Sequence, residues 1–239
     1  MSMKLLDLPA LLKGNAYPGR GIVLGMSPDG QQALFAYFIM GRSENSRNRV
    51  FVRDGDELTI RLYDESRLSD PSLILYRPTA TVGDALIVTN GDQTDTIVSS
   101  LKDGGSFISA LNTREFEPDA PNFTPRISGM MTFAGGNASI QMGLLRAADA
   151  QGSACDRHYY TYPALQGTGR FIHTYEQDGN PLPSFTGEPR KVAIPNDTDA
   201  FAQAIWDSLN PDNKVALCVR AYDIKTRTSR FWMFNRHEV

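Results

Sequence analysis

Helical and strand-like patterns in this sequence do not alternate one by one, and this order restricts the fold more than any other feature. Apolar residues at helical spacing occur within residues 92–114 and 196–209, and a shorter helical pattern broken by Pro9 covers residues 5–12. Strand-like runs joined by Gly- and Asp-rich turns fill the regions between them. A doubly wound parallel fold requires strands and helices to alternate, so this order disfavours it. The sequence predicts instead an α+β protein with layered antiparallel sheets.

Turn residues indicate how the predicted strands pair. The segment Ser27-Pro28-Asp29-Gly30 separates two apolar runs, so residues 17–40 are predicted to form a hairpin. Further strands are predicted at residues 50–52, 58–63, 80–89, 128–134, 138–145, 159–162, 169–175, 215–223 and 229–235, with a short apolar run at 73–76 and turns at 54–57, 83–84 and 135–137. Two helices, near residues 96–101 and 106–114, are predicted between the strands at 80–89 and 128–134.

Length and composition are those of a globular protein with a sizeable core. The chain has 239 residues, of which 41% are hydrophobic. We therefore expect a single domain over residues 1–239, with residues 1–16 as an N-terminal arm and residues 17–239 as the core. No run of about 18 apolar residues is present, so no membrane span is predicted. Residues 1–16 lack a basic segment followed by an apolar one, so secretion is not expected.

Cysteine, histidine and charge content exclude several classes of site. Cys155 and Cys218 lie far apart and belong to no CxxC motif, and the chain has only three histidines. The chain therefore offers few cysteine and histidine ligands for a zinc site. We expect both thiols to be buried and reduced in a cytoplasmic protein. The net charge of −3 argues against a general nucleic-acid-binding protein.

A polar segment directly follows the predicted strand at residues 32–40. Residues 41–49 carry three arginines, and 18 of the 24 basic residues of the chain are arginine. Planar guanidinium groups suit the bidentate binding of phosphate or carboxylate. An exposed, solvated loop is the alternative, but the position directly after a buried hairpin favours a binding site.

A second polar segment, residues 89–95, begins the first of the two neighbouring predicted helices. Free backbone N–H groups at a helix start favour an anion or a polarised carbonyl group. Asn90 or Asp92 can equally be an ordinary cap of that helix, and the sequence leaves both interpretations open.

A third polar segment, residues 115–126, contains three prolines, which forbid a regular helix and predict a defined loop. Glu117 and Asp119 in this loop are candidate carboxylate bases, although most acidic loop residues face water. The chain has no G-x-x-x-x-G-K-[ST], no G-x-G-x-x-G before a helix and no G-x-S-x-G. It is therefore not expected to be a P-loop enzyme, a dinucleotide-binding enzyme or a serine hydrolase of the elbow type.

Five short motifs follow one another between residues 17 and 177. They are Tyr17-x-Gly19-Arg20, then Arg42-Ser43 with Asn48-Arg49, then V-G-D…T-N-G-x-Q-T-D-T-I over residues 82–97, then E-x-D…T-P-R-I over residues 117–127, and Thr174-Tyr175-Glu176-Gln177. Each motif is short, but their common order is fairly specific. Together they resemble the archaeal-type IMP cyclohydrolase family, and the C-terminal part of the chain resembles it only in general character.

The resemblance implies an activity and a fold. The family closes 5-formamidoimidazole-4-carboxamide ribotide to inosine monophosphate in purine synthesis, so a purine ribotide is the implied partner. No metal, redox cofactor or nucleoside triphosphate is implied. The implied fold is the four-layer α-β-β-α sandwich with antiparallel sheets of the N-terminal-nucleophile hydrolases, without their nucleophile. In this chain no Ser, Thr or Cys begins the first core strand.

The resemblance also implies roles for individual residues. It places Arg49, Tyr76 and Glu117 at the reacting centre, where an arginine or phenol stabilises charge and a carboxylate moves a proton. The positions that it implies for substrate binding are Tyr17, Arg20, Arg42, Ser43, Asn48, Asn90, Gly91, Asn122 and Arg126.

The chain departs from the family pattern in several places. Phe116 stands where the pattern has tyrosine, and Phe123 separates Asn122 from the following Thr-Pro-Arg. Residues 1–16 and 149–169 are additions to the family pattern. They leave open a change in the substrate pocket or in the interface of a homo-oligomer. Two other functions also stay open, namely a non-catalytic purine-nucleotide-binding protein on the same fold and a related amide hydrolase. The missing nucleophile weighs against the hydrolase.

Overall fold

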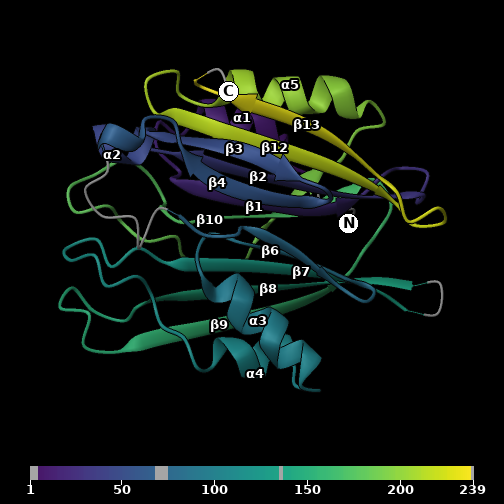
Figure 1. Ribbon diagram of the computed structural model, residues 1–239, viewed down its shortest axis with the longest axis horizontal. Coiled ribbons are helices and arrows are strands. Elements are labelled where there is room, and N and C mark those ends of the chain that lie inside the picture. The colour runs from purple at the N-terminus through teal and green to yellow at the C-terminus, as the bar shows by residue number, and fades with distance from the viewer. Residues whose placement is uncertain (1–4, 68–74, 135–136, 238–239) are drawn as a thin grey trace.

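The computed structural model describes residues 5–67, 75–134 and 137–237, and its strands form three antiparallel sheets (Figure 1). The helices are α1 (Leu8–Lys13), α2 (Glu44–Arg47), α3 (Gln93–Lys102), α4 (Phe107–Leu111) and α5 (Thr198–Ser208), with a 3-10 turn at Glu65–Arg67. The strands are β1 (Arg20–Met26), β2 (Gln32–Met40), β3 (Arg49–Asp54), β4 (Glu57–Leu62), β5 (Thr79–Val82), β6 (Ala85–Thr89), β7 (Arg126–Ala134), β8 (Asn137–Ala147), β9 (Cys155–Pro163), β10 (Thr168–His173), β11 (Arg190–Ala193), β12 (Lys214–Asp223) and β13 (Ser229–Asn235). The predicted α+β class with antiparallel sheets is confirmed.

The larger sheet has the strand order β11-β10-β1-β2-β12-β13. Its centre is the β1–β2 hairpin, in which Arg20 pairs with Ile39, as predicted for residues 17–40. The turn between the two strands ends at Gly30, whose φ of 74° is a conformation that glycine adopts without strain. This register brings Arg20, at the start of β1, beside Met40, after which the polar segment begins.

The second sheet has the order β5-β6-β7-β8-β9 and stacks on the first (Figure 1). One buried cluster contains Ile22 of β1, Met131 of β7 and Met142 of β8, so the two sheets share a core. The approach is close at Gly129, where an added Cβ would lie 2.8 Å from a methyl group of Leu24. The two-stranded sheet β3–β4 packs its apolar face into the same cluster.

Helices cover the two outer faces of the stacked sheets (Figure 1). Leu12 of α1 and Ile205 of α5 belong to the buried cluster on the outer side of the six-stranded sheet. Ile97 of α3 and Phe107 of α4 belong to a third cluster with Met130, on the outer side of the five-stranded sheet. Among the described residues, no helix combines the length and the apolar character that crossing a membrane requires.

Helix α2 and strand β11 were not predicted, and each has a local reason. The four-residue helix α2 is too short to show periodicity, and it is held by a capping box in which Ser43 and Ser46 bond each other's backbone N–H groups. Strand β11 is a four-residue edge strand without an apolar run. The predicted turn at 135–137, the apolar run at 73–76 and the arm at 1–16 fall partly outside the described residues.

A buried histidine predicts how stability depends on pH. His173 at the end of β10 is 4% exposed and stacks on Phe171, and burial lowers its pKa to about 4. The Tyr175 carbonyl lies 2.7 Å from Nδ1 and can only accept, so Nδ1 carries the proton of the neutral ring. Because the folded pKa lies below the unfolded value near 6.5, the unfolded chain binds the extra proton between these two values. The free energy of unfolding should therefore fall by roughly 2–4 kcal/mol as the pH drops from about 6.5 to 4.

The measurement is urea unfolding at a series of pH values in that window. His173→Asn keeps a donor for the Tyr175 carbonyl but cannot titrate, so its pH dependence should be flatter by that amount. An equally steep dependence in wild type and His173→Asn would contradict the assignment.

Candidate active site

A cavity of about 360 Å³ opens at the end of the sheets where β1 begins and β2 ends. Five of the residues predicted for the site line it, namely Tyr17, Arg20, Ser43, Arg49 and Glu117. They come from the start of β1 and the residues just before it, from the polar segment at residues 41–49, and from the loop before β7. The structure thus brings together three segments that are far apart in the sequence.

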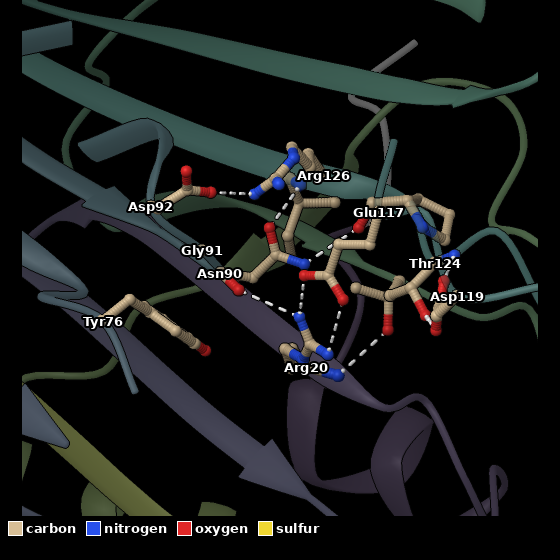
Figure 2. A network of polar contacts seen from close by, with 12 residues as sticks. Arg20, Tyr76, Asn90, Gly91, Asp92, Glu117, Asp119, Thr124 and Arg126 are labelled. Carbon is tan, nitrogen blue, oxygen red and sulfur yellow. Dashed lines mark hydrogen bonds and ion pairs between the residues drawn. The ribbon is translucent and has the colours of Figure 1, made fainter. Parts of the chain in front are cut away.

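Arg20 and Glu117 form the most buried ion pair of the cavity. Arg20 Nη1 donates to Glu117 Oε1 at 2.5 Å and Nη2 to Oε2 at 3.1 Å, and the two side chains are 14% and 2% exposed. Burial alone would lower the pKa of Arg20, but the Glu117 carboxylate raises it well above its usual range. Arg20 Nη1 also donates to the Asn90 carbonyl at 2.9 Å, which ties the pair to the end of β6 (Figure 2).

Arg49 is a buried cation without a carboxylate partner among the described residues. It is 2% exposed, and its Nε and Nη2 donate to the carbonyl groups of Ser46 at 2.8 Å and Met40 at 3.4 Å. Its Nη1 is buried and has no hydrogen-bond partner within the part of the chain that the structure describes. Burial lowers the pKa of Arg49, and the nearby Tyr76 is the largest opposing influence. A buried donor of this kind can bind an anion or a carbonyl oxygen in the cavity.

Tyr76 does not line the cavity but points toward it. Figure 2 shows its hydroxyl directed toward Arg20. The same hydroxyl lies 2.5 Å from that of Tyr37, a fully buried residue of β2. Burial, reinforced by Tyr76, raises the pKa of Tyr37 well above its usual value, so this phenol stays neutral. Tyr37 therefore holds Tyr76 in place by a hydrogen bond from below the cavity.

The segment after β6 is built around polar side chains and not around a helix cap. Asn90 is fully buried, and it donates to the Pro125 carbonyl at 2.8 Å and accepts from the Ile127 N–H at 2.8 Å. Asp92 is the N-cap residue of α3, yet its side chain bonds none of the helix N–H groups and pairs instead with Arg126 at 2.6 Å and with Arg114. Asp92 therefore occupies the predicted N-cap position without making the hydrogen bond of a cap, and Asn90 joins the end of β6 to the loop before β7 (Figure 2).

Gly91 and Arg126 belong to this network and lie behind the cavity. Arg126 donates to Gln93 Oε1 at 2.8 Å and is 7% exposed. A Cβ on residue 91 would lie 2.4 Å from Arg126 Nη1, so glycine leaves the space that this guanidinium occupies.

Three other predicted residues lie outside the cavity. Arg42 is exposed at its rim, where it pairs with Asp178 at 2.8 Å and lies over the Tyr17 ring. Asn48 is buried, and its amide bonds the backbone of Asp64 in both directions at 2.8 Å. Asn122 accepts from the Leu182 N–H at 3.1 Å. Asn48 and Asn122 are thus used to fix loops around the site.

Several lining residues were not assigned from the sequence. Asp119 and Tyr175 both line the cavity, and both contact the buried Thr124. From the sequence, Asp119 is a candidate carboxylate base together with Glu117, and Tyr175 lies in the last of the five motifs, to which no role is assigned. Gly19, Met40, Asn45 and Ser46 complete the lining.

Gly19 gives the clearest steric constraint at the site. Its φ is 75°, and an added Cβ would lie 2.2 Å from Thr174 Oγ1 and 2.5 Å from the Tyr175 ring. Gly19→Ala is expected to lower the free energy of unfolding by about 2–4 kcal/mol, because backbone strain and a steric clash add. Gly55 is the matched control, since its φ is 59° but nothing lies within 4 Å of its Cβ position.

The measurement is denaturant unfolding of both variants. Gly55→Ala should lose only about 1 kcal/mol, the cost of the backbone conformation alone. An equal loss of unfolding free energy in the two variants would show that the clash with Tyr175 does not destabilise the protein.

A larger cavity, about 670 Å³, lies near the other end of β1, around Met26 and Gly30. Its two charged lining residues, Asp84 and Arg227, pair with each other at 2.9 Å on the surface. None of its described lining residues is a buried charge without a partner, so the smaller cavity remains the candidate site. Within residues 5–67, 75–134 and 137–237, no group of three His, Cys, Asp or Glu side chains is placed to hold a metal ion.

Comparisons with known proteins agree with the motifs. The family model described as IMP cyclohydrolase-like protein matches residues 17–227. The IMP cyclohydrolase of Methanopyrus kandleri is 32% identical over 116 residues, which is 47% of this chain and 57% of that protein. The IMP cyclohydrolase of Methanococcus maripaludis strain C7 is 35% identical over 121 residues, which is 48% of this chain and 58% of that protein. This chain therefore spans less than two thirds of the length of these relatives. Because the family match extends over 17–227 of a 239-residue chain, the protein belongs to the family of IMP cyclohydrolase-like proteins.

Proposed function

We propose that the protein is an IMP cyclohydrolase, which closes 5-formamidoimidazole-4-carboxamide ribotide to inosine monophosphate with loss of water. Membership of the family, and the similarity to two proteins named IMP cyclohydrolase, support this activity. The observation that carries the proposal is Arg49, a buried guanidinium whose Nη1 is unpartnered among the described residues and which lines the same cavity as the Arg20–Glu117 pair.

The reaction joins two groups that the substrate already carries. The carboxamide nitrogen attacks the formyl carbon and a C–N bond forms. The formyl oxygen then leaves as water with one proton from the carboxamide nitrogen and one from the formamido nitrogen, which becomes doubly bonded to the former formyl carbon. An enzyme assists by holding both groups at reacting distance, which is worth up to about 7–11 kcal/mol in favourable cases. A cavity of about 360 Å³ suits this task because its walls restrict the substrate's conformations.

Charge develops on the formyl oxygen during the attack. In the proposed mechanism Arg49 Nη1 donates to this oxygen, and its low-dielectric surroundings strengthen the interaction. Tyr76 is the second donor, because Tyr37 can supply the hydrogen that the Tyr76 oxygen accepts and so leaves the Tyr76 proton free to donate.

The proton on the carboxamide nitrogen needs an acceptor and the departing hydroxyl needs a donor. Glu117 is proposed to serve both steps, because each carboxylate oxygen keeps a second lone pair after binding Arg20. Arg20 is proposed to hold Glu117 in position, and Asn90, Gly91 and Arg126 to hold Arg20 from behind.

The remaining predicted residues are proposed to bind the ribotide or to support its binding site. Tyr17 and Ser43 line the cavity, and Arg42 lies at its rim, where an anionic phosphate would compete with Asp178. Asn48 and Asn122 are proposed to shape the site through the loops that they fix.

We also propose that the sheets and helices form four layers. The order of helices, sheet, sheet and helices supports the four-layer α-β-β-α sandwich of N-terminal-nucleophile hydrolases, used here without an N-terminal nucleophile. We further propose that residues 1–239 form one domain with an N-terminal arm, and that it acts in the cytoplasm. The contact between α1 and the outer face of the six-stranded sheet supports the single domain.

The test is conversion of the formylated ribotide by the purified protein without added metal, followed by absorbance and by chromatography of the products. Inosine monophosphate is the expected product. Binding of inosine monophosphate without turnover would favour a non-catalytic binding protein, and release of formate would favour an amide hydrolase. Either result would overturn the cyclohydrolase assignment.

A further inference from the structure

One wall of the cavity contains a chain of hydrogen bonds to which the proposed reaction assigns no role. Thr124 Oγ1 lies 2.5 Å from Asp119 Oδ2 and 2.5 Å from the Tyr175 hydroxyl. The Thr124 N–H donates to the other Asp119 oxygen at 2.6 Å. Thr124 is 1% exposed, whereas Asp119 and Tyr175 both line the cavity. Asp119 makes no ion pair with any described residue, so these two donors from Thr124 stabilise its charge.

The chemistry of the three groups determines the direction of each hydrogen bond. A carboxylate can only accept, so the Thr124 hydroxyl gives its single hydrogen to Asp119. Only lone pairs of Thr124 Oγ1 then remain for Tyr175, so Tyr175 donates its own hydrogen to Thr124. The Tyr175 hydroxyl is left with lone pairs alone for any group in the cavity.

The surroundings keep Tyr175 neutral and fixed. Burial raises the pKa of its hydroxyl above the usual value, so it does not ionise near neutral pH. Its ring is stacked on Tyr17 with centroids 5.9 Å apart, and Gly19 gives it room. The hydroxyl therefore cannot turn away without breaking these contacts.

One wall of the cavity thus accepts hydrogen bonds, and another donates them. Asp119 and Tyr175 accept hydrogen bonds, whereas Arg49 and Arg20 can only donate them. A bound molecule satisfies both walls only if it presents O–H or N–H groups to one and carbonyl or anionic oxygens to the other.

We propose that Tyr175 is a specificity-determining hydrogen-bond acceptor, whose proton is held by Thr124 and Asp119 so that the cavity selects a ligand with an O–H or N–H group at this wall. The identity of the ligand rests on the proposed function. In inosine monophosphate, the ribose hydroxyls and the ring N–H are both donors of this class.

The direction of the hydrogen bonds is tested first on the ligand-free protein by NMR with labelled tyrosine. A Tyr175 hydroxyl proton that exchanges slowly with water and shows a nuclear Overhauser effect to the Thr124 methyl group is expected in the wild type. Thr124→Ser keeps the hydroxyl and should keep the slow exchange, whereas Thr124→Val should make exchange fast. A wild-type Tyr175 proton that exchanges fast would overturn the proposal.

Recognition is tested next by calorimetry with inosine monophosphate and its 2′,3′-dideoxy analogue. Tyr175→Phe should weaken binding of inosine monophosphate about tenfold, Thr124→Val should weaken it as well, and Thr124→Ser should bind like the wild type. Tyr159→Phe is the matched control, because that hydroxyl bonds Asn112 at 2.7 Å on an exposed surface and should not affect binding.

The dideoxy analogue identifies the donor. If the ribose hydroxyls donate to Tyr175, Tyr175→Phe and the wild type should bind the analogue equally. If the ring N–H donates to Tyr175 instead, Tyr175→Phe should bind the analogue about tenfold more weakly than the wild type. Equal binding of inosine monophosphate by Tyr175→Phe and the wild type would overturn the proposal. No binding to the wild type would instead overturn the proposed function, and the NMR result would then decide the role of Tyr175 as an acceptor.

Discussion

Replacing Arg49 with methionine is expected to lower kcat for ring closure about 10²–10³-fold, the usual cost of losing one donor to a developing oxyanion. The side chain is 2% exposed and its Nη1 has no partner among the described residues, so its donor capacity is available to a ligand. The variant should stay folded, because no buried carboxylate loses its counterion. The free energy of unfolding should change by no more than roughly 1–2 kcal/mol, the value of the two hydrogen bonds to carbonyl groups.

Steady-state kinetics and urea unfolding on the same samples separate the two effects. Arg53→Met is the matched control, since Arg53 lies on the same strand but is exposed. It should show wild-type kcat. A wild-type kcat in Arg49→Met would remove Arg49 from the mechanism, and a collapse of stability would make it a structural residue.

Replacing Glu117 with alanine is expected to lower the free energy of unfolding by about 3–5 kcal/mol, because Arg20 would keep a buried charge without its partner. The pair is bidentate, and its side chains are only 14% and 2% exposed, so water cannot easily replace the carboxylate. The same substitution should also remove most of the activity, and Glu117→Gln should lower the rate about 10²–10⁴-fold with a smaller loss of stability.

A double replacement of Arg20 and Glu117 by methionine distinguishes the contribution of Glu117 to stability from its contribution to activity. It removes both charges, so stability should largely return while activity stays low. Glu115→Ala is the control in the same loop, since its pair with Arg157 is 65% exposed on the glutamate side and should contribute less than about 1 kcal/mol. A Glu117→Ala variant as stable as Glu115→Ala would contradict the buried-pair argument.

Local sequence patterns were sufficient to predict most strands and their antiparallel hairpins, but not which strands share a sheet or how the loops meet. The β1–β2 hairpin follows from two apolar runs and a Ser-Pro-Asp-Gly turn, all within residues 17–40. Strand β11 and helix α2 are four residues long, and such short elements show no periodicity. Their existence depends on pairing with β10 and on the Ser43 capping box.

The same limit applies to the site. Arg49 and Glu117 were identified from motifs, yet the motifs could not show that Arg49 is buried without a carboxylate or that Glu117 pairs with Arg20 across 97 positions. Tyr175 and Thr124 are 51 positions apart, and their contact is a product of tertiary structure. Asn90 illustrates the opposite case, since a residue typical of a helix cap is used instead to bond a loop.

The two stacked sheets differ in how the chain supplies them, and this difference bears on the order of folding. The five-stranded sheet and its helices use the uninterrupted stretch from β5 to β9, so they can assemble from local contacts during synthesis. The six-stranded sheet places β1 and β2 between β10 and β12, so its central hairpin gains its neighbouring strands only from the last third of the chain. Arg20 lies in this late sheet and Glu117 in the loop that leads to the early one. The Arg20–Glu117 pair therefore forms only when the two sheets pack together, and an unfinished chain lacks this wall of the cavity.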